Sequence, residues 1–180
     1  MPTLPTPRYT HTAIALHWLI ALALLGTFCV GLYMTGLPLS PQRLKLYNWH
    51  KWAGITILAL SIARLAWRLT HRPPADVPMP PWQQRAAQWA HRALYGLFFA
   101  VPLAGWAYSS AAGFPIVVFG VLPLPSFVPA DKALAELIKP VHEILAYALA
   151  LVVLAHVAAA LKHHFVDRDG LLTRMWPQRT

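Results

Sequence analysis

Residues 140–165 read PVHEILAYALALVVLAHVAAALKHHF, and this stretch decides the fold. It contains no charged residue between Glu143 and Lys162. A helix needs about 20 mostly apolar residues to cross the hydrocarbon core of a bilayer. Pro140 suits the first turn of a helix, because the N–H that it lacks would have no partner there. The stretch therefore predicts a transmembrane helix over about residues 140–165.

Two further runs, residues 9–42 and 93–130, also lack Asp, Glu, Lys and Arg. Over its 180 residues the chain is 57% hydrophobic and only 12% charged. These proportions exclude an ordinary water-soluble domain. Tryptophan and tyrosine gather near the ends of the apolar runs, as they do at membrane–water interfaces. The composition indicates an integral membrane protein.

We expect an all-α fold, an integral membrane four-helix bundle that forms a single domain over residues 1–180. Clusters of glycine and proline end the first two helices. Pro102 is expected to kink the third helix without breaking it, since membrane helices tolerate proline. Residues 109–131 are apolar but rich in glycine and proline, and we expect a loop that lies along the surface there. The expected helices cover residues 12–34, 46–69, 84–108 and 140–165.

The basic residues are divided unequally between the two sides of these helices. Ten lie on the side that holds both termini: Arg8, Arg64, Arg68, Arg72, Arg85, Arg92, Lys162, Arg168, Arg174 and Arg179. Five lie on the other side: Arg43, Lys45, Lys51, Lys132 and Lys139. Because basic loops stay in the cytoplasm, both termini are expected on the cytoplasmic side of the membrane. The first apolar run lacks a small-residue cleavage site after a short core, so we expect no cleaved signal peptide.

The net charge of +9 does not indicate a nucleic-acid partner, because the basic residues lie in loops and at helix ends, where membrane proteins carry them. Cys29 is the only cysteine. A lone cysteine excludes a disulfide framework, a Cys-x-x-Cys-His haem attachment site and a thiolate metal site. Any cofactor must therefore be held by other side chains.

The nine histidines are the candidate functional residues, because the apolar runs contain no carboxylates. His142 and His156 are 14 residues apart, which places them within about 40° of one helix face and about 21 Å apart along the axis. An ionisable side chain inside a membrane is costly and is a functional candidate by default. Two ligands on one face, one near each membrane surface, are the arrangement that a pair of stacked haems requires.

The depths of the other histidines suggest their pairing. His50 lies at the outer level and is able to meet His142, whereas His156 at the inner level is able to meet His17 or His91. The spacing alone does not choose between the last two. Facing helices of a bundle can supply both axial imidazoles of a haem iron. The alternative is that these histidines are hydrogen-bonded structural groups of a colourless transporter or scaffold.

Three residues at the same helical spacing have two interpretations each. Gly31 lies 14 residues after His17, and Gly105 lies 14 residues after His91, so a flat macrocycle has room to approach both; close helix packing explains such glycines equally well. Arg64 lies 14 residues after His50. It is placed to neutralise a haem propionate or hold a quinone carbonyl, unless it extends to the membrane surface.

The chain resembles the bacterial cytochrome b561 family over nearly its whole length, and two parts carry the resemblance. The first runs from Tyr9 to Arg68 and the second from His142 to Asp169. The most specific motifs of the resemblance are His17-Trp18, Tyr47-Asn48-Trp49-His50-Lys51, the arginines Arg64 and Arg68, His142-Glu143, His156, and His163-His164-Phe165-Val166-Asp167-Arg168-Asp169.

The resemblance implies a four-helix cytochrome with two non-covalent b haems. It implies that His17 and His156 ligate the haem on the cytoplasmic side and that His50 and His142 ligate the outer haem. His91 is then left with a secondary role. By the same resemblance His163 is a quinone or proton contact, and His164 is its weaker alternative.

The resemblance also implies an activity. A described member of the family is a superoxide oxidase that passes electrons from periplasmic superoxide to ubiquinone. The expected partners are therefore membrane lipid, quinone, and superoxide or a periplasmic redox protein. The alternative function is a relay subunit that oxidises quinol and reduces a periplasmic redox protein.

Overall fold

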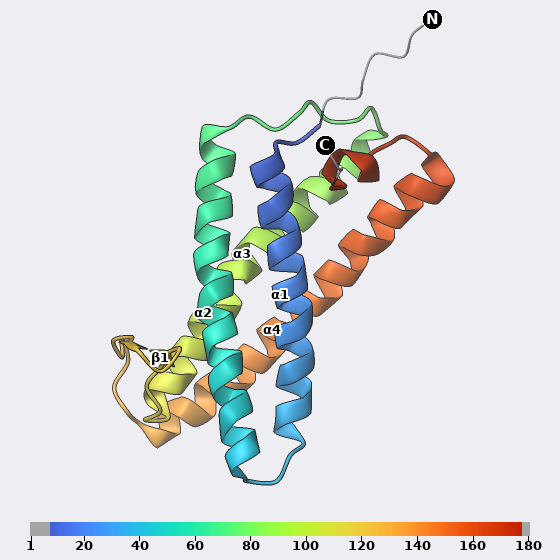
Figure 1. Ribbon diagram of the computed structural model, residues 1–180. Coiled ribbons are helices and arrows are strands. Elements are labelled where there is room, and N and C mark those ends of the chain that lie inside the picture. Colours follow the sequence, from blue (N-terminus) through green and yellow to red (C-terminus); the bar gives the residue numbers. More distant parts are fainter. Residues whose placement is uncertain (1–7, 178–180) are drawn as a thin grey trace, which may run out of the picture.

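A computed structural model describes residues 8–177 and consists of four long helices with short elements between and after them (Figure 1). The helices are α1 (His11–Thr35), α2 (Pro41–Thr70), α3 (Pro81–Ala111) and α4 (Lys132–Lys162). The short elements are β1 (Val117–Val118), β2 (Leu122–Pro123), the π-helix η1 (His163–Asp167) and the 3-10 helix η2 (Leu172–Met175). The all-α fold expected from the sequence is thus confirmed.

Local signals explain where the first three helices begin. The Thr10 hydroxyl accepts a hydrogen bond from the Ala13 N–H, and the Ser40 hydroxyl accepts one from the Arg43 N–H, so both residues cap a helix N-terminus. Pro41 and Pro81 occupy the first positions of α2 and α3. The second helix therefore begins five residues before the position expected from its apolar pattern.

The start of α4 differs from the expectation. The helix begins at Lys132, not near Pro140, because the Asp131 carboxylate accepts a hydrogen bond from the Leu134 N–H at 3.0 Å and caps the helix earlier. Pro140 lies inside α4, where it removes one i→i−4 hydrogen bond, to the Glu136 carbonyl. The regular α-helix also ends earlier, at Lys162, and continues as η1.

The helices pack in chain order. The closest backbone packing joins α3 to α4 and α1 to α2, and α2 also packs on α3. In Figure 1, α1 and α2 stand side by side, and α3 and α4 cross behind them at an angle. Within the described residues, no comparable packing joins α4 to α1 or to α2.

Within residues 8–177, three segments are long and apolar enough to cross a membrane: α1, α2 and residues 132–167. Large apolar side chains on them lie outside the bundle; Leu22, Leu151 and Leu154 are 64%, 69% and 67% exposed. Such exposure in water would be unfavourable, and it fits contact with lipid. The third helix, α3, is not among the three segments, although it is as long as α4 and packs between α2 and α4. Its proline, glycine, tryptophan and tyrosine residues lower its mean hydropathy.

The segment after α3 is a loop, as expected, but it contains a short hairpin. Strands β1 and β2 are antiparallel, with Val118 opposite Leu122. Gly120 has φ +74°, a conformation that glycine adopts without strain. The indole N–H groups of Trp52 on α2 and Trp106 on α3 donate to backbone carbonyls of this loop. The loop is thereby fixed to two helices.

The two ends of the described chain meet at one end of the bundle. The Tyr9 N–H donates to the Arg174 carbonyl, and the Trp18 indole donates to the Met175 carbonyl at 2.8 Å. The α2–α3 linker crosses the same end, since Arg174 donates to the Ala75 carbonyl (Figure 1). We call this the termini end, and the end with β1 and β2 the hairpin end. Arg179, counted above among the basic residues, lies outside the described residues.

Candidate functional site

Two histidines face each other at the hairpin end. His50 on α2 and His142 on α4 have ring centroids 6.2 Å apart and ring planes at 89°. Each ring forms a hydrogen bond through Nδ1 to a backbone carbonyl of a neighbouring helix: Thr27 on α1 at 3.1 Å for His50, and Val101 on α3 at 3.0 Å for His142. The outer pair expected from the sequence is thus brought together.

Three histidines meet at the termini end. The ring centroids of His17 on α1 and His156 on α4 are 6.3 Å apart, with planes at 68°. The ring centroids of His91 on α3 and His156 are 5.6 Å apart. Both candidates that the sequence left open are therefore beside His156.

The separations within the two pairs fit a metal ion between opposed imidazoles. Imidazole nitrogens bind first-row metals at about 2.0–2.1 Å, and each nitrogen is about 1.1 Å from its ring centroid, so a bridged pair has centroids about 6.2–6.4 Å apart. The pairs His50–His142 and His17–His156 have this separation, at 6.2 and 6.3 Å. The His91–His156 separation of 5.6 Å is shorter than this range.

Each histidine pair joins two helices that are not packed closely against each other. His17 and His156 lie on α1 and α4, and His50 and His142 lie on α2 and α4. Close backbone packing instead joins α1 to α2, α2 to α3 and α3 to α4. Ser61 on α2 adds a second sign of a missing partner: it is 0% exposed, and its Oγ is the one buried side-chain polar atom without a hydrogen bond among the described residues. The residues present thus fit haem at two levels.

A basic cavity of about 190 Å³ adjoins the termini-end histidines. Arg64 lines it and donates to the Ala13 carbonyl at 3.2 Å, one helical turn from His17. The guanidinium is therefore turned inward onto α1. The cavity is also lined by Arg8, Arg68, His71 and Arg72, without any acidic side chain, so it suits an anionic or carbonyl group.

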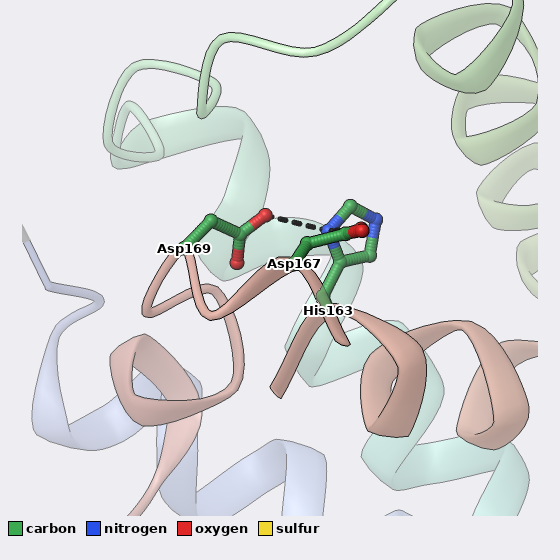
Figure 2. A group of neighbouring side chains, drawn as sticks. All are labelled: His163, Asp167 and Asp169. Carbon is green, nitrogen blue, oxygen red and sulfur yellow. Dashed lines mark hydrogen bonds and ion pairs between the residues drawn. The ribbon is translucent and has the colours of Figure 1, made fainter. Parts of the chain in front are cut away.

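His163 lies at the start of η1, next to this end of α4 (Figure 2). It is only 8% exposed, and its Nδ1 lies 2.6 Å from Asp169 Oδ2 and 3.2 Å from Asp167 Oδ2. Partial burial acts to raise the pKa of Asp169, but hydrogen bonds from the Leu171 N–H and from His163 outweigh it and hold this pKa below its usual value. The ring is thus held through Nδ1.

The ligand atoms of His163, Asp167 and Asp169 lie within 4.8 Å of one another, a spacing that also suits a metal ion. However, the Lys162 ammonium is 2.6 Å from Asp167 and already neutralises that carboxylate. The neighbouring His164 is exposed. We therefore interpret the group as a hydrogen-bonded network around a buried imidazole.

Some residues of the site were not found from the sequence. The carbonyls of Thr27 and Val101 were missed because backbone acceptors leave no pattern in a sequence. Gly31 and Gly105 were found, but their neighbours differ from the expectation: a Cβ on Gly31 would lie 3.1 Å from His50 Cε1, and one on Gly105 would lie 2.9 Å from His142 Cε1. An imidazole ring, not an open face, lies against each glycine.

Comparisons with known proteins identify the family of this chain. The family model described as prokaryotic cytochrome b561 matches residues 8–178. Cytochrome b561 homolog 2 of Escherichia coli K12 is 36% identical over 170 residues, which cover 93% of this chain and 90% of the relative. Cytochrome b561 homolog 1 of the same organism is 35% identical over 179 residues, covering 96% and 98%.

A third relative, named probable superoxide oxidase CybB, comes from Yersinia pestis. It is 31% identical over 173 residues, which cover 96% of this chain and 97% of the relative. All three alignments extend over nearly the whole of both chains, and the family model includes every histidine of the two levels. The chain therefore belongs to the prokaryotic cytochrome b561 family, the haem b-binding electron-transfer proteins of bacterial membranes.

Proposed function

We propose that this protein is a di-haem b cytochrome that transfers electrons between the periplasmic side of the inner membrane and the quinone pool. In this proposal residues 1–180 form one domain, all four helices cross the membrane, and the termini end faces the cytoplasm. One observation carries the proposal: two imidazole pairs lie at opposite ends of the helix bundle, and their ring centroids are almost equally far apart, at 6.2 and 6.3 Å.

The axial ligands are assigned from these pairs. His50 and His142 ligate the haem at the hairpin end, and His17 and His156 ligate the haem at the termini end. His91 stands beside His156 without ligating. When bound, haem b supplies the one-electron chemistry, while the chain supplies ligation, position and charge.

The most specific form of the proposal is superoxide oxidation coupled to ubiquinone reduction. Two superoxide anions each lose one electron at the hairpin end and leave as O₂. One ubiquinone takes up the two electrons and two protons at the termini end and becomes ubiquinol. The relative from Yersinia pestis, 31% identical and named probable superoxide oxidase, supports this form.

Two residues at the termini end are proposed to serve ubiquinone. Protonated at both ring nitrogens, His163 donates from Nε2 to a quinone carbonyl while its Nδ1–H donates to the Asp169 carboxylate. Arg64 lines the basic cavity beside His17 and is placed to bind a haem propionate or the second quinone carbonyl. Protons reach this site from the cytoplasm, and His163 is the group best placed to pass them on.

A relay function is the second candidate, and the hairpin favours it. Phe119, Val121 and Leu122 are 69%, 82% and 60% exposed, which makes an apolar surface beside the outer pair. A protein partner needs such a surface, whereas a small anion does not. In this case the chain oxidises quinol and reduces a periplasmic redox protein.

One experiment tests the proposal and separates the two candidates. The purified protein is reduced with dithionite, its haem is counted per chain, and it is then reoxidised with a short-chain ubiquinone and exposed to a superoxide pulse. Two b haems that are oxidised by quinone and rapidly re-reduced by superoxide are the expected result. Haems that exchange with quinone but ignore superoxide would favour the relay, and protein without b haem would contradict both.

The ligand assignment has its own test. His17→Ala is expected to lose the haem of the termini end, whereas His91→Ala is expected to keep both haems. His71→Ala is the control, because this exposed ring stacks on Trp67 and contacts neither pair. Haem loss in His91→Ala together with full retention in His17→Ala would overturn the assignment.

A further inference from the structure

The two imidazoles at the hairpin end are fixed by backbone carbonyls. A carbonyl oxygen only accepts hydrogen bonds, so Nδ1 must carry the proton in both His50 and His142. The lone pair of each ring is then on Nε2. A ligating histidine that donates its other N–H to a carbonyl has a fixed tautomer and orientation and is a more basic ligand. Among the described residues, neither His17 nor His156 has such a bond.

A glycine lies against each of these rings. A Cβ at Gly105 would be 2.9 Å from Cε1 and 3.2 Å from Nδ1 of His142, and a Cβ at Gly31 would be 3.1 Å from Cε1 of His50. A methyl group at either position would press on the edge of the ring that forms the hydrogen bond. Only glycine leaves the imidazole where it is.

The glycine and the accepting carbonyl have the same spacing on both helices. Thr27 precedes Gly31 by four residues on α1, and Val101 precedes Gly105 by four residues on α3. Residues four apart lie on one face of a helix, one turn from each other. Helices α1 and α3 are also the closest packing partners of α2 and α4, which carry the two histidines.

We propose that Thr27 with Gly31 and Val101 with Gly105 form two matched imidazole sockets that set the tautomer and the ring plane of the hairpin-end ligands. The helices that do not ligate this haem therefore still position it. The inference rests on the proposed function, in which His50 and His142 are axial ligands. It assigns a positioning role to two glycines and two backbone carbonyls, and none of these groups touches the iron.

The sockets have two consequences. They hold the two rings nearly perpendicular, at 89°, whereas the rings of the termini-end pair are at 68°. Perpendicular imidazole planes give a low-spin ferric haem a strongly anisotropic EPR spectrum with a large principal g value. The carbonyl bonds also make the hairpin-end ligands more basic, which stabilises ferric iron and lowers the potential of this haem relative to the other.

The test substitutes each glycine and compares it with another glycine of the same helix. The variants are Gly31→Ala and Gly105→Ala, and the controls are Gly26→Ala on α1 and Gly96→Ala on α3, where a Cβ would meet nothing within 4 Å. Each protein is purified with its haem. Haem per chain, the EPR spectrum of the oxidised protein and a redox titration are then measured.

The two controls are expected to keep the wild-type spectrum and potentials, since alanine favours a helix over glycine. Gly31→Ala and Gly105→Ala are expected to lose the hairpin-end haem, or to keep it with a smaller principal g value and a raised potential. The haem at the termini end remains in both. Wild-type haem content, spectrum and potentials in both variants would overturn the proposal.

Two further measurements protect the test. First, the larger principal g value in the wild-type spectrum must belong to the haem that His50→Ala removes. If it belongs to the other haem, the proposal is overturned, even where the glycine variants fail to fold. His50→Ala and His142→Ala also test the proposed function. If both keep the hairpin-end haem, the ligand assignment fails; if they lose it while the glycine variants behave as the wild type, only the sockets fail.

Discussion

At the scale of single residues, one hydrogen bond determines what His163 is able to do. Its Nδ1 lies 2.6 Å from Asp169 Oδ2, and this contact holds the ring that is proposed to bind quinone through Nε2. In Asp169→Asn a neutral amide replaces the carboxylate, and a hydrogen bond to a charged group contributes about 1.5–3 kcal/mol. We therefore expect reoxidation by ubiquinone to slow by about tenfold or more, since 1.4 kcal/mol is a factor of ten. Stopped-flow spectroscopy measures this rate, with haem content unchanged.

The control for this variant is Asp76→Asn, which changes an exposed carboxylate at the same end of the molecule. It is expected to reoxidise at the wild-type rate. Equal rates in Asp169→Asn and Asp76→Asn would show that the carboxylate does not position His163. A slow rate accompanied by haem loss would point to a structural defect instead.

The lowered pKa of Asp169 predicts how this contribution depends on pH. A carboxyl whose folded pKa is below its unfolded value, about 3.9, stabilises the fold fully above that unfolded value. The contribution is lost as the pH falls through the lower folded pKa. The free energies of unfolding of the wild type and Asp169→Asn are therefore expected to differ at pH 7 and to converge in acid. Denaturation series from pH 7 to 3 check this, and a constant difference would contradict it.

His163 was identified from the sequence, but its carboxylate partner was not. Asp169 reaches the ring because the end of α4 widens into the π-helix η1 and Arg168 then turns the chain back with φ +53°. A positive φ at an arginine is uncommon and has no sequence signature. The histidine pairs were easier to infer, since a 14-residue spacing fixes face and depth on any straight helix.

At the scale of helices, the N-caps determine the boundaries more than the apolar pattern does. Thr10 accepts from the Ala13 N–H and also from the Trp67 indole at 3.0 Å, which joins the start of α1 to the end of α2. Thr10→Ala removes both hydrogen bonds and is expected to lower the free energy of unfolding by about 1–2 kcal/mol. Thr12→Ala, an exposed change in the same helical turn, serves as the control. Unfolding in detergent measures both, and equal stability of the two variants would contradict the role of the cap.

The expected boundary of α4 was wrong for a related reason. Proline is common in the first turn of a helix, so the sequence predicts a start near Pro140. The cap is Asp131, nine residues earlier, and the charged residues between them masked the helix in an apolar pattern. The apolar pattern located the part of each helix that contacts lipid, and the polar turns beyond it could only be seen from hydrogen bonds.

At the scale of the whole molecule, the proposed superoxide reaction depends on the charge of the hairpin end. Five basic residues there face only Asp131, Glu136 and Glu143. The Lys139–Glu143 pair, 3.9 Å apart and exposed, is the one ion pair at this end among the described residues. Because an exposed ion pair of this kind is weak, it leaves the basic side chains of the hairpin end available to attract an anion.

The rate of haem reduction by superoxide is therefore expected to fall as salt is added. The Debye length shrinks from about 30 Å at 0.01 M to about 8 Å at 0.15 M ionic strength, which screens the attraction.

The double variant Lys132→Gln with Lys139→Gln leaves equal numbers of basic and acidic residues at the hairpin end. Its rate should be lower at low salt and nearly independent of ionic strength, whereas Arg85→Gln at the termini end should retain the wild-type salt dependence. Pulse radiolysis over a salt series measures these rates. A wild-type rate that does not change with salt would show that the surface charge does not guide superoxide.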